Sequence, residues 1–327
     1  MPIDEAVSDV VRITTPLPFR PRSVHAYLAP LDEGGWMLVD GGIDTDEAWA
    51  ALTAGIRQVA SWADLRVHVL THMHVDHMGL ARRVQDASSV PIAMGVLDSE
   101  RAAHAAAEPE EEADYRAGLL RSTGAPEDIL HRIGESNRQV GALARFVAPT
   151  HDLPISRAPV PLAAEWIAVW TPGHTAGHIS LFRERDGVLI AGDAILPTIS
   201  PTIGVNRQRP DPVADYWEAL DRLESLQPRI VLPGHGGAMR GAGRILELRE
   251  ELLLEGDRVL ALLTTVPASP WTIAERRYAG RELPFHLRIQ ALRETLAHLE
   301  HLASRGSVER RRDGERIRFA LATTTAS

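Results

Sequence analysis

The 327-residue chain contains no cysteine and no lysine. The absence of cysteine excludes disulfides, thiolate metal ligands and cysteine nucleophiles. The absence of lysine also excludes Schiff-base chemistry and a Walker-type phosphate loop. The chain has 35 arginines, which are its only permanently charged basic side chains. No apolar run approaches the ~20 residues that a membrane-spanning helix needs, so no membrane partner is expected.

The remaining composition is that of a soluble globular protein, with 44% hydrophobic and 24% charged residues. The N-terminal residues 1–5 lack the basic and apolar regions of a signal peptide, so we expect a cytoplasmic location. The net charge of -9 is uneven, because residues 264–327 carry 11 Arg against 7 Asp and Glu. An acidic body disfavours non-specific phosphate binding, whereas the basic tail leaves a nucleic-acid partner open.

Strand-like apolar runs alternate with helix-like segments over most of the chain, which predicts an α/β core. A helix is expected over residues 45–60. The expected strands cover residues 10–13, 25–28, 36–39, 67–70, 166–170, 178–182, 187–191 and 229–232. Residues 98–150 are rich in Ala, Glu and Arg, and we interpret this stretch as a helical insertion with helices over 98–107, 110–122 and 126–145.

The pattern changes again beyond about residue 245. A strong helix over 245–263 is followed by Ser269-Pro270, a helix cap with proline at the first helical position, and by a helix over 286–304. Asp313-Gly314 then separates two short strand-like runs and predicts a hairpin. We therefore predict a catalytic domain over 1–245, and a linker helix with a small winged-helix-like domain over 246–327.

Three histidines and an aspartate lie within six residues, directly after the strand expected at 67–70: His72, His74, Asp76 and His77. Such side chains are costly to bury without partners, and they are ligands that zinc and similar ions take. In an extended loop alternate side chains share a face, so His72, His74 and Asp76 are expected to converge, with His77 turned toward a neighbouring position. These four residues are too many to bind one ion, and they are too closely spaced to form two independent sites. The pattern therefore favours two adjacent ions.

The ends of three later strands repeat a simpler pattern, in which a glycine turn is followed by one ligand-type residue. These residues are His174, Asp193 and His235. Ligands at the carboxyl ends of several strands meet at one edge of a sheet. Two ions about 3.5–4 Å apart need about as many ligands as the seven found here, with room left for water.

Three further residues are assigned to the surroundings of these ligands. Asp40 ends an apolar strand and is expected to orient a metal-bound histidine, and Thr71 directly precedes His72. His178, four residues after His174, is expected to hydrogen-bond behind the ligands, and it is also a catalytic candidate together with Asp76. No substrate-binding residue can be named from the sequence.

The four motifs, in this order, resemble those of the metallo-β-lactamase superfamily over about residues 10–240: His72-x-His74-x-Asp76-His77, Thr-Pro-Gly-His ending at 174, Gly192-Asp193 and Gly234-His235. The resemblance implies an αβ/βα sandwich, in which two sheets pack between helices. It implies one metal held by His72, His74 and His174, a second held by Asp76, His77 and His235, and Asp193 as the bridge between them. The C-terminal region resembles the winged-helix domain that one branch of the superfamily carries.

The site predicts hydrolysis by a metal-bridging hydroxide that two divalent ions generate from water near neutral pH. Zinc fits the ligands best, and iron and manganese bind similar sets. True β-lactamases of the superfamily mostly lack the aspartate found here at 193, so the resemblance favours thioesterases, glyoxalase-II-like enzymes, lactonases and nucleases. We favour attack on the thioester or ester carbonyl of a small acyl substrate, of acyl-CoA or hydroxyacyl-glutathione type, with Asp76 as a proton acceptor.

Three alternatives remain open at this point. A single-stranded RNA endonuclease is one, because the branch with the same appended domain contains such enzymes; it predicts steep salt dependence of binding. A lactonase is the second. A winged-helix DNA-binding regulator is the third, but the helix over 286–304 offers only Arg288 and Arg293 beside Glu294 and Glu300. The appended domain is instead expected to serve in a homodimer or to shape the rim of the active site.

Overall fold

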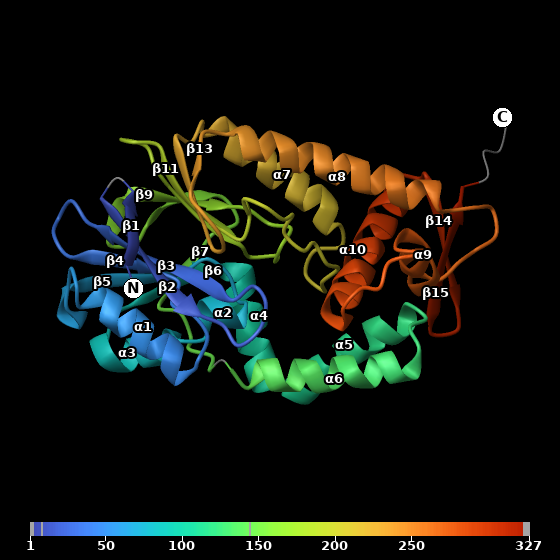
Figure 1. Cartoon of the computed structure of the whole chain (residues 1–327), viewed down its shortest axis with the longest axis horizontal. Coiled ribbons are helices and arrows are strands. Elements are labelled where there is room, and N and C mark those ends of the chain that lie inside the picture. Colours follow the sequence, from blue (N-terminus) through green and yellow to red (C-terminus); the bar gives the residue numbers. More distant parts are fainter. Residues whose placement is uncertain (1–2, 8, 144, 323–327) are drawn as a thin grey trace.

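The computed structural model describes residues 3–7, 9–143 and 145–322. Two β-sheets face each other with helices on both outer sides, and a region of helices and a hairpin follows at the C-terminal end (Figure 1). The predicted α/β sandwich is therefore confirmed. Within those ranges, we find no helix with the length and apolar character to span a membrane.

The first sheet has the strand order β1-β2-β3-β4-β5-β6-β7. Its first four strands pair antiparallel, and its last four, beginning with β4, pair parallel. The hairpin expected between residues 25 and 39 is formed by β3 and β4. The strands are β1 (Ile3–Val7), β2 (Val10–Pro16), β3 (Ser23–Pro30), β4 (Trp36–Val39), β5 (Leu65–Leu70), β6 (Ile92–Gly95) and β7 (His151–Leu153).

The second sheet has the order β13-β12-β11-β10-β9-β8. Only β11 and β12 pair parallel, so their carboxyl ends lie next to each other. All four strands predicted between residues 166 and 232 are present in it, each within three residues of its expected ends. The strands are β8 (Arg157–Val160), β9 (Ala163–Trp170), β10 (Ile179–Arg183), β11 (Val188–Gly192), β12 (Ile230–Pro233) and β13 (Met239–Arg240).

The core is layered because each sheet buries both of its faces. Between the sheets, residues such as Val69 and Trp166 pack in one apolar cluster. The outer face of the first sheet packs on α1 and α3 through Leu52 and Val84. The outer face of the second sheet packs on α7 and α8 through residues such as Leu220. The helices are α1 (Asp46–Ile56), α2 (Val75–Met78), α3 (Ala81–Ser88), α7 (Pro212–Ser225) and α8 (Gly243–Ala261).

The predicted insertion forms three helices, α4 (Val96–Ala107), α5 (Pro109–Ser122) and α6 (Glu127–Gly141). Residue 144, within the helix expected over 126–145, lies outside the described residues, as do residues 1 and 2 of the N-terminal stretch. The insertion does not stand alone, because Leu120 and Ile133 pack against Trp271 and Leu292 of the C-terminal region. The two regions thus form one apolar contact.

The C-terminal region contains α9 (Pro270–Arg277), α10 (Phe285–Ser304), β14 (Val308–Asp313) and β15 (Arg316–Leu321). Ser269 caps α9 as expected, since its hydroxyl accepts the backbone N–H of Thr272. The hairpin of β14 and β15 packs on α10 through a cluster that includes Phe319 and Leu299. The winged-helix assignment and the domain boundary at 245 stay predictions.

His298 of α10 makes the fold sensitive to acid. Burial, and then the charge of Arg277, lower the pKa of His298 to about 4, while an unfolded histidine titrates near 6.5. Because the unfolded chain binds more protons between these pH values, stability is lost as the pH falls through this window. We expect His298 to lower the free energy of unfolding by about 2 kcal/mol at pH 5 relative to pH 7.5.

Urea unfolding of the wild type and of His298→Gln at both pH values measures this loss. The variant should lose about 2 kcal/mol less than the wild type on acidification. Identical losses in the two proteins would show that His298 does not titrate in this window.

Candidate metal centre

Strand ends deliver the candidate ligands to one edge shared by the two sheets. His72 follows β5, His174 follows β9, and Asp193 and His235 follow the neighbouring ends of β11 and β12. The backbone N–H of Ile179 donates to Thr71 O at 2.9 Å, which ties the end of β5 to the second sheet. All seven residues predicted as ligands lie at this edge, in three groups whose ligand atoms are within 4.8 Å of one another.

Close packing at this edge explains a glycine in the last motif. A Cβ atom on Gly234 would lie 2.3 Å from Asp193 Oδ1 and 2.7 Å from His77 Cε1. Any side chain there would displace the ligand atoms. The position before His235 therefore requires glycine for space.

The segment 72–77 is extended only as far as His74. His74 is the N-cap of α2, so Asp76 and His77 lie on a helical turn and not on an extended loop. The expectation that His72, His74 and Asp76 share one face is therefore wrong for Asp76. The structure groups His72 and His74 with His174, and Asp76 and His77 with His235.

The backbone and neighbouring side chains fix the orientation of four imidazole rings. In each ring Nδ1–H donates to a nearby oxygen, which directs Nε2, the other ring nitrogen, at the cluster. For His72 this oxygen is the hydroxyl of Thr71, whose own hydrogen goes to Asp40. The other three pairs are His77 with Asp40 Oδ2 at 2.8 Å, His174 with Thr202 O at 2.9 Å and His235 with Ser23 O at 2.7 Å.

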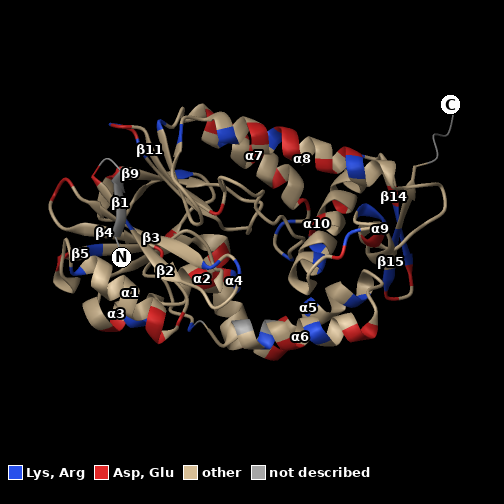
Figure 2. Cartoon of the chain, viewed as in Figure 1, with Lys and Arg blue, Asp and Glu red and all other residues tan. Residues whose placement is uncertain are grey.

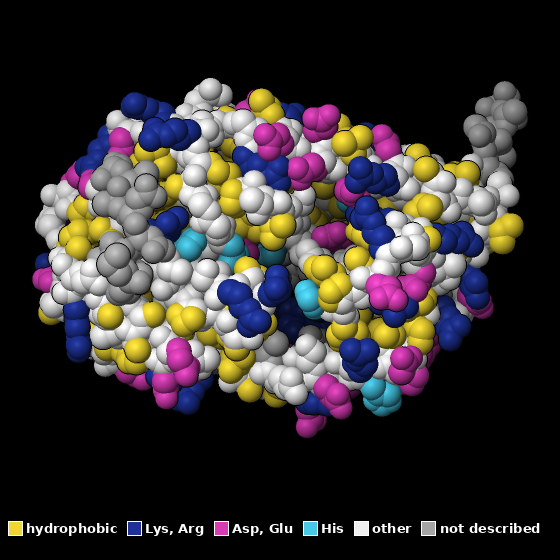
Figure 3. All heavy atoms as spheres, in the orientation of Figure 1, with side chains coloured by type: hydrophobic (Ala, Val, Ile, Leu, Met, Phe, Trp, Pro, Cys, Tyr) yellow, Lys and Arg dark blue, Asp and Glu magenta, His cyan; other side chains and the backbone are white. Residues whose placement is uncertain are grey.

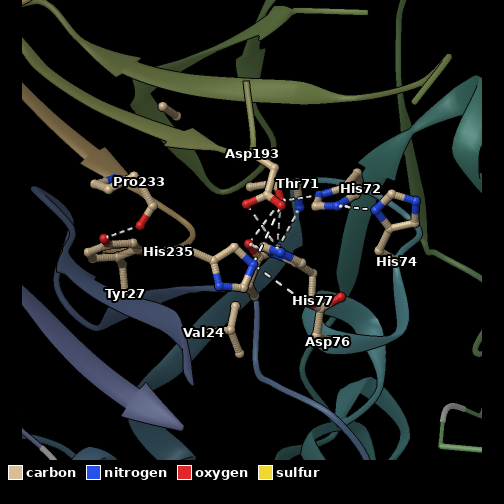
Figure 4. Close-up of polar contacts among 12 residues, drawn as sticks. Val24, Tyr27, Thr71, His72, His74, Asp76, His77, Asp193, Pro233 and His235 are labelled. Atoms are coloured by element: carbon tan, nitrogen blue, oxygen red, sulfur yellow. Dashed lines mark hydrogen bonds and ion pairs between the residues drawn. The ribbon is translucent and has the colours of Figure 1, made fainter. Parts of the chain in front are cut away.

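The nitrogen lone pairs face one another and two carboxylates across a small space (Figure 4). His77 Nε2 lies 3.4 Å from Asp193 Oδ1, and His235 Nε2 lies 3.4 Å from Asp76 Oδ2. Asp193 Oδ2 is 3.5 Å from His235 Nε2 and 3.7 Å from His174 Nε2. Two atoms bound tetrahedrally at roughly 2.0–2.2 Å from an ion lie about 3.3–3.6 Å apart, so these separations fit shared ligation.

The third ligand of the first group is His74. Its Nδ1 lies 3.0 Å from His72 Nε2 and 2.8 Å from His174 Nε2. The Nε2 atoms of His72 and His174 are both acceptors, so one proton on His74 cannot satisfy both at once. Three nitrogens converging in this way are satisfied together by a cation.

Two buried polar atoms support the same conclusion. His77 Nε2 and Asp193 Oδ1 have no hydrogen-bond partner among the described residues, although both are shielded from solvent. Buried polar atoms without partners are rare and need an explanation such as an ion. Imidazole nitrogens with carboxylate oxygens suit zinc, iron or manganese. The residues present therefore fit a divalent metal.

The electrostatics of the protein alone are those of a strongly coupled set. Burial lowers the pKa of His72 well below its usual value, and the neighbouring His77 and His74 lower it further. Burial also opposes protonation of His77, but the carboxylates of Asp193 and Asp40 outweigh it and raise the pKa of His77 well above 6.5. Positive charge is thus favoured on the Asp193 side of the cluster.

Asp40 and Thr71 lie where the sequence predicted supporting residues. Asp40 accepts hydrogen bonds from the backbone N–H of Thr71, the hydroxyl of Thr71 and Nδ1–H of His77. Its φ of 56° lies in the left-handed region, which is uncommon for a residue other than glycine. Backbone strain of this kind persists where the surroundings hold it, and here it aims one carboxylate at two ligand-bearing segments.

His178 is placed behind the cluster. Its Nε2 accepts the backbone N–H of Asp193 at 3.1 Å, and its Nδ1 lies 2.8 Å from the hydroxyl of Thr171. The ring is fully buried, and burial followed by the charge of His174 lowers its pKa well below 6.5. Because both nitrogens are engaged inside the protein, we assign His178 a positioning role in place of the catalytic role predicted from the sequence.

Asp98 at the start of α4 is a site residue that the sequence analysis missed. It accepts the hydroxyl of Thr175 at 2.6 Å and the backbone N–H groups of Gly177 and Met73 at 2.7 and 2.9 Å. One buried carboxylate therefore holds the loop that carries His174 to the loop that carries His72 and His74. Nothing in its surrounding sequence marks it, because its partners are distant in the chain.

Tyr27 and His25 of β3 were missed in the same way. The hydroxyl of Tyr27 donates to Pro233 O at 2.6 Å, and the backbone N–H of His25 donates to Gly234 O at 2.8 Å (Figure 4 shows the first). The first sheet thereby holds the loop that carries His235.

We expect Asp98→Asn to lower metal affinity and kcat about tenfold without unfolding the protein. The amide keeps one acceptor oxygen but turns its NH₂ group toward donors, which leaves at least one buried N–H unsatisfied at a cost of about 1–3 kcal/mol. Metal titration, steady-state kinetics and urea unfolding measure the three effects. Full metal affinity and full kcat in a destabilised Asp98→Asn protein would show that Asp98 serves the fold alone.

With this geometry established, comparison with known proteins assigns the family. A model of the Metallo-beta-lactamase superfamily matches residues 19–235. The chain belongs to the metallo-beta-lactamase superfamily. A relative over nearly its whole length is the probable metallo-hydrolase YqjP of Bacillus subtilis (strain 168), which is 26% identical over 323 residues, 95% of this chain and 97% of YqjP.

Two solved structures match nearly the whole chain, including the C-terminal region. A beta-lactamase domain protein from Burkholderia ambifaria has a TM-score of 0.82 and 28% identity, over 98% of this chain and 94% of that chain. A metallo-beta-lactamase family protein from Thermus thermophilus has a TM-score of 0.78 and 29% identity, over 97% of this chain and 100% of that chain. The hydroxyacylglutathione hydrolase of Rhodobacter capsulatus is 26% identical over 255 residues, 75% of this chain and 80% of that enzyme.

Proposed function

We propose that this superfamily member uses two divalent ions, zinc by preference, to hydrolyse the thioester or ester bond of a small acyl substrate. The observation that carries the proposal is the convergence of oriented imidazole lone pairs with the carboxylates of Asp76 and Asp193. One ion is assigned to His72, His74 and His174, and the other to Asp76, His77 and His235. Asp193 Oδ2 lies between His174 and His235, one residue of each set, which supports its role as a bridge.

When bound, such ions lower the pKa of water to about 7 and polarise a carbonyl oxygen. The chain's own residues keep the ligand atoms ready for this chemistry. Asp40 and Thr71 hold the protons on Nδ1 of His77 and His72, so that Nε2 of each ring is the atom turned toward the ions. His178 fixes the backbone of Asp193, and Asp98 joins the two ligand loops.

An acyl substrate is favoured over a nucleic acid for two reasons. The similarity to a hydroxyacylglutathione hydrolase extends over three quarters of this chain, and that name describes cleavage of an acyl thioester. The net charge of -9 opposes a long polyanion, and Arg310 and Arg318 of the basic hairpin are each paired with an acidic residue.

The test is a substrate panel assayed with zinc-, iron- and manganese-loaded protein. It contains an acyl thioester, an aryl ester, a γ-lactone and a single-stranded RNA oligonucleotide, each with the wild type and with His174→Ala. Thioester or ester turnover that depends on His174 would support the proposal. Faster His174-dependent cleavage of the lactone or the RNA than of any ester would contradict it and assign a lactonase or a nuclease.

A further inference from the structure

Four arginines lie close together on a chain that is acidic overall, and Figure 3 shows dark blue basic side chains around the central hollow of the face in view. We call them the cleft arginines: Arg101 of α4, Arg116 of α5, Arg207 of the loop before α7, and Arg293 of α10. Figure 2 shows basic residues on α4, α5 and α10. Segments far apart in the sequence thus bring positive charge to one place.

The acidic partners in this cluster are fewer than the cations. Arg101 and Arg116 both donate to the same oxygen of Glu112, each at 2.5 Å. Arg207 lies 3.0 Å from Glu111 and 3.8 Å from the other oxygen of Glu112. Two glutamates therefore pair with three arginines, and Arg293 adds a fourth positive charge to the cluster.

Arg293 itself has no acceptor for its guanidinium within the part of the chain that the structure describes. Its side chain is open to solvent, yet the surrounding protein, and then the charge of Arg116, lower its pKa. Arg101 is the only other described arginine with a lowered pKa; wherever else a shift is resolved, partner carboxylates raise it. An arginine cannot lose its proton at working pH, so this position attracts an anion.

Two structural connections link the cleft arginines to the metal centre. Thr202 O holds His174, and two residues later a Cβ on Gly204 would lie 3.9 Å from Cβ of Arg293. On the other side, Arg101 lies one turn of α4 beyond Asp98, whose carboxylate holds both ligand loops. The loop of Gly204 therefore joins His174 to Arg293, and α4 joins Asp98 to Arg101.

We propose that Arg293, flanked by Arg116, binds an anionic group on the acyl substrate, a carboxylate or a phosphate, and so selects charged over neutral thioesters. A guanidinium binds either group through two parallel hydrogen bonds. This inference rests on the proposed acyl hydrolysis and names its substrate class. It assigns to α10 of the C-terminal region a direct contact with substrate.

Three acetyl thioesters distinguish the sources of the anion: S-acetylglutathione with carboxylates, acetyl-CoA with phosphates, and the neutral S-acetyl-N-acetylcysteamine. The wild type should prefer one anionic thioester over the neutral one, mainly through a lower KM. Arg293→Gln should reduce that preference, as a ratio of kcat/KM values, about tenfold. Arg305→Gln, on the exposed end of the same helix, is the matched control and should keep the preference.

Binding of anions that cannot be hydrolysed separates this inference from the proposed function. Calorimetry with S-methylglutathione and with the S-methyl thioether of CoA should show about tenfold weaker binding to Arg293→Gln than to the wild type. Arg293-dependent binding without any ester turnover would overturn the proposed hydrolysis and keep the anion site. Equal binding to both proteins, or turnover with no preference for an anionic thioester, would overturn the anion site and leave the hydrolysis standing.

Discussion

Removal of metal by a strong chelator is expected to reduce hydrolysis at least a thousandfold. The Nε2 atoms of His72, His77, His174 and His235 point at one space, and without bound metal this space offers no Lewis acid to a carbonyl. Binding at a thousand times the dissociation constant stabilises the folded state by about 4 kcal/mol, so the thermal midpoint should also fall by several degrees. Turnover and melting of protein before and after dialysis measure both effects.

Adding metals back provides the control for this experiment. Zinc, iron(II) or manganese should restore turnover, and the ion that restores most identifies the working metal, whereas magnesium should restore little because it prefers oxygen ligands. Chelated protein that is shown to be metal-free and still turns over at the original rate would exclude a metal-dependent reaction.

The second large effect is expected for Asp193→Asn. Asp193 opposes three histidines, and its charge is the strongest influence that raises the pKa of His77. The amide has the same shape but no charge, and its NH₂ group would face imidazole nitrogens or a cation. We expect at least one bound ion to be lost at micromolar metal and kcat to fall at least a hundredfold.

Asp152→Asn on β7 is the matched control, because its side chain is exposed and belongs to none of the three ligand groups. Metal stoichiometry, steady-state kinetics and circular dichroism of the two variants separate loss of the site from loss of the fold. Full occupancy by two ions with undiminished turnover in Asp193→Asn would exclude its assignment as the bridge.

The helices and strands that could be predicted from the sequence have a strong pattern of hydrophobicity or composition. The strand at 187–191 is a continuous apolar run, and the strand at 67–70 is interrupted only by the buried His68, because both faces of each sheet are covered. The helical insertion follows from its Ala, Glu and Arg content. In contrast, β7 (His151–Leu153) and β8 (Arg157–Val160) are short and partly exposed, so neither carries a run that composition or periodicity could reveal.

The candidate ligands were predictable because local patterns mark them: His72, His74, Asp76 and His77 cluster directly after a strand, and the other three each follow a glycine turn. Asp98 and Arg293 were not, since each gains its role from contacts with segments far along the chain. In the sequence, Arg293 is an ordinary arginine on a helix; only the fold shows that it has no acidic partner among the described residues. The orientation of the Asp76 side chain could not be predicted from the sequence either, because four residues are too few to distinguish a helical turn from an extended loop.

The most direct test of the central claim is the metal content of protein purified without chelator. Elemental analysis should find about two equivalents of divalent transition metal per wild-type chain, and clearly fewer in His174→Ala and Asp193→Asn. Wild-type protein that hydrolyses a thioester while holding no stoichiometric metal, or variants that hold as much metal as the wild type, would contradict the account.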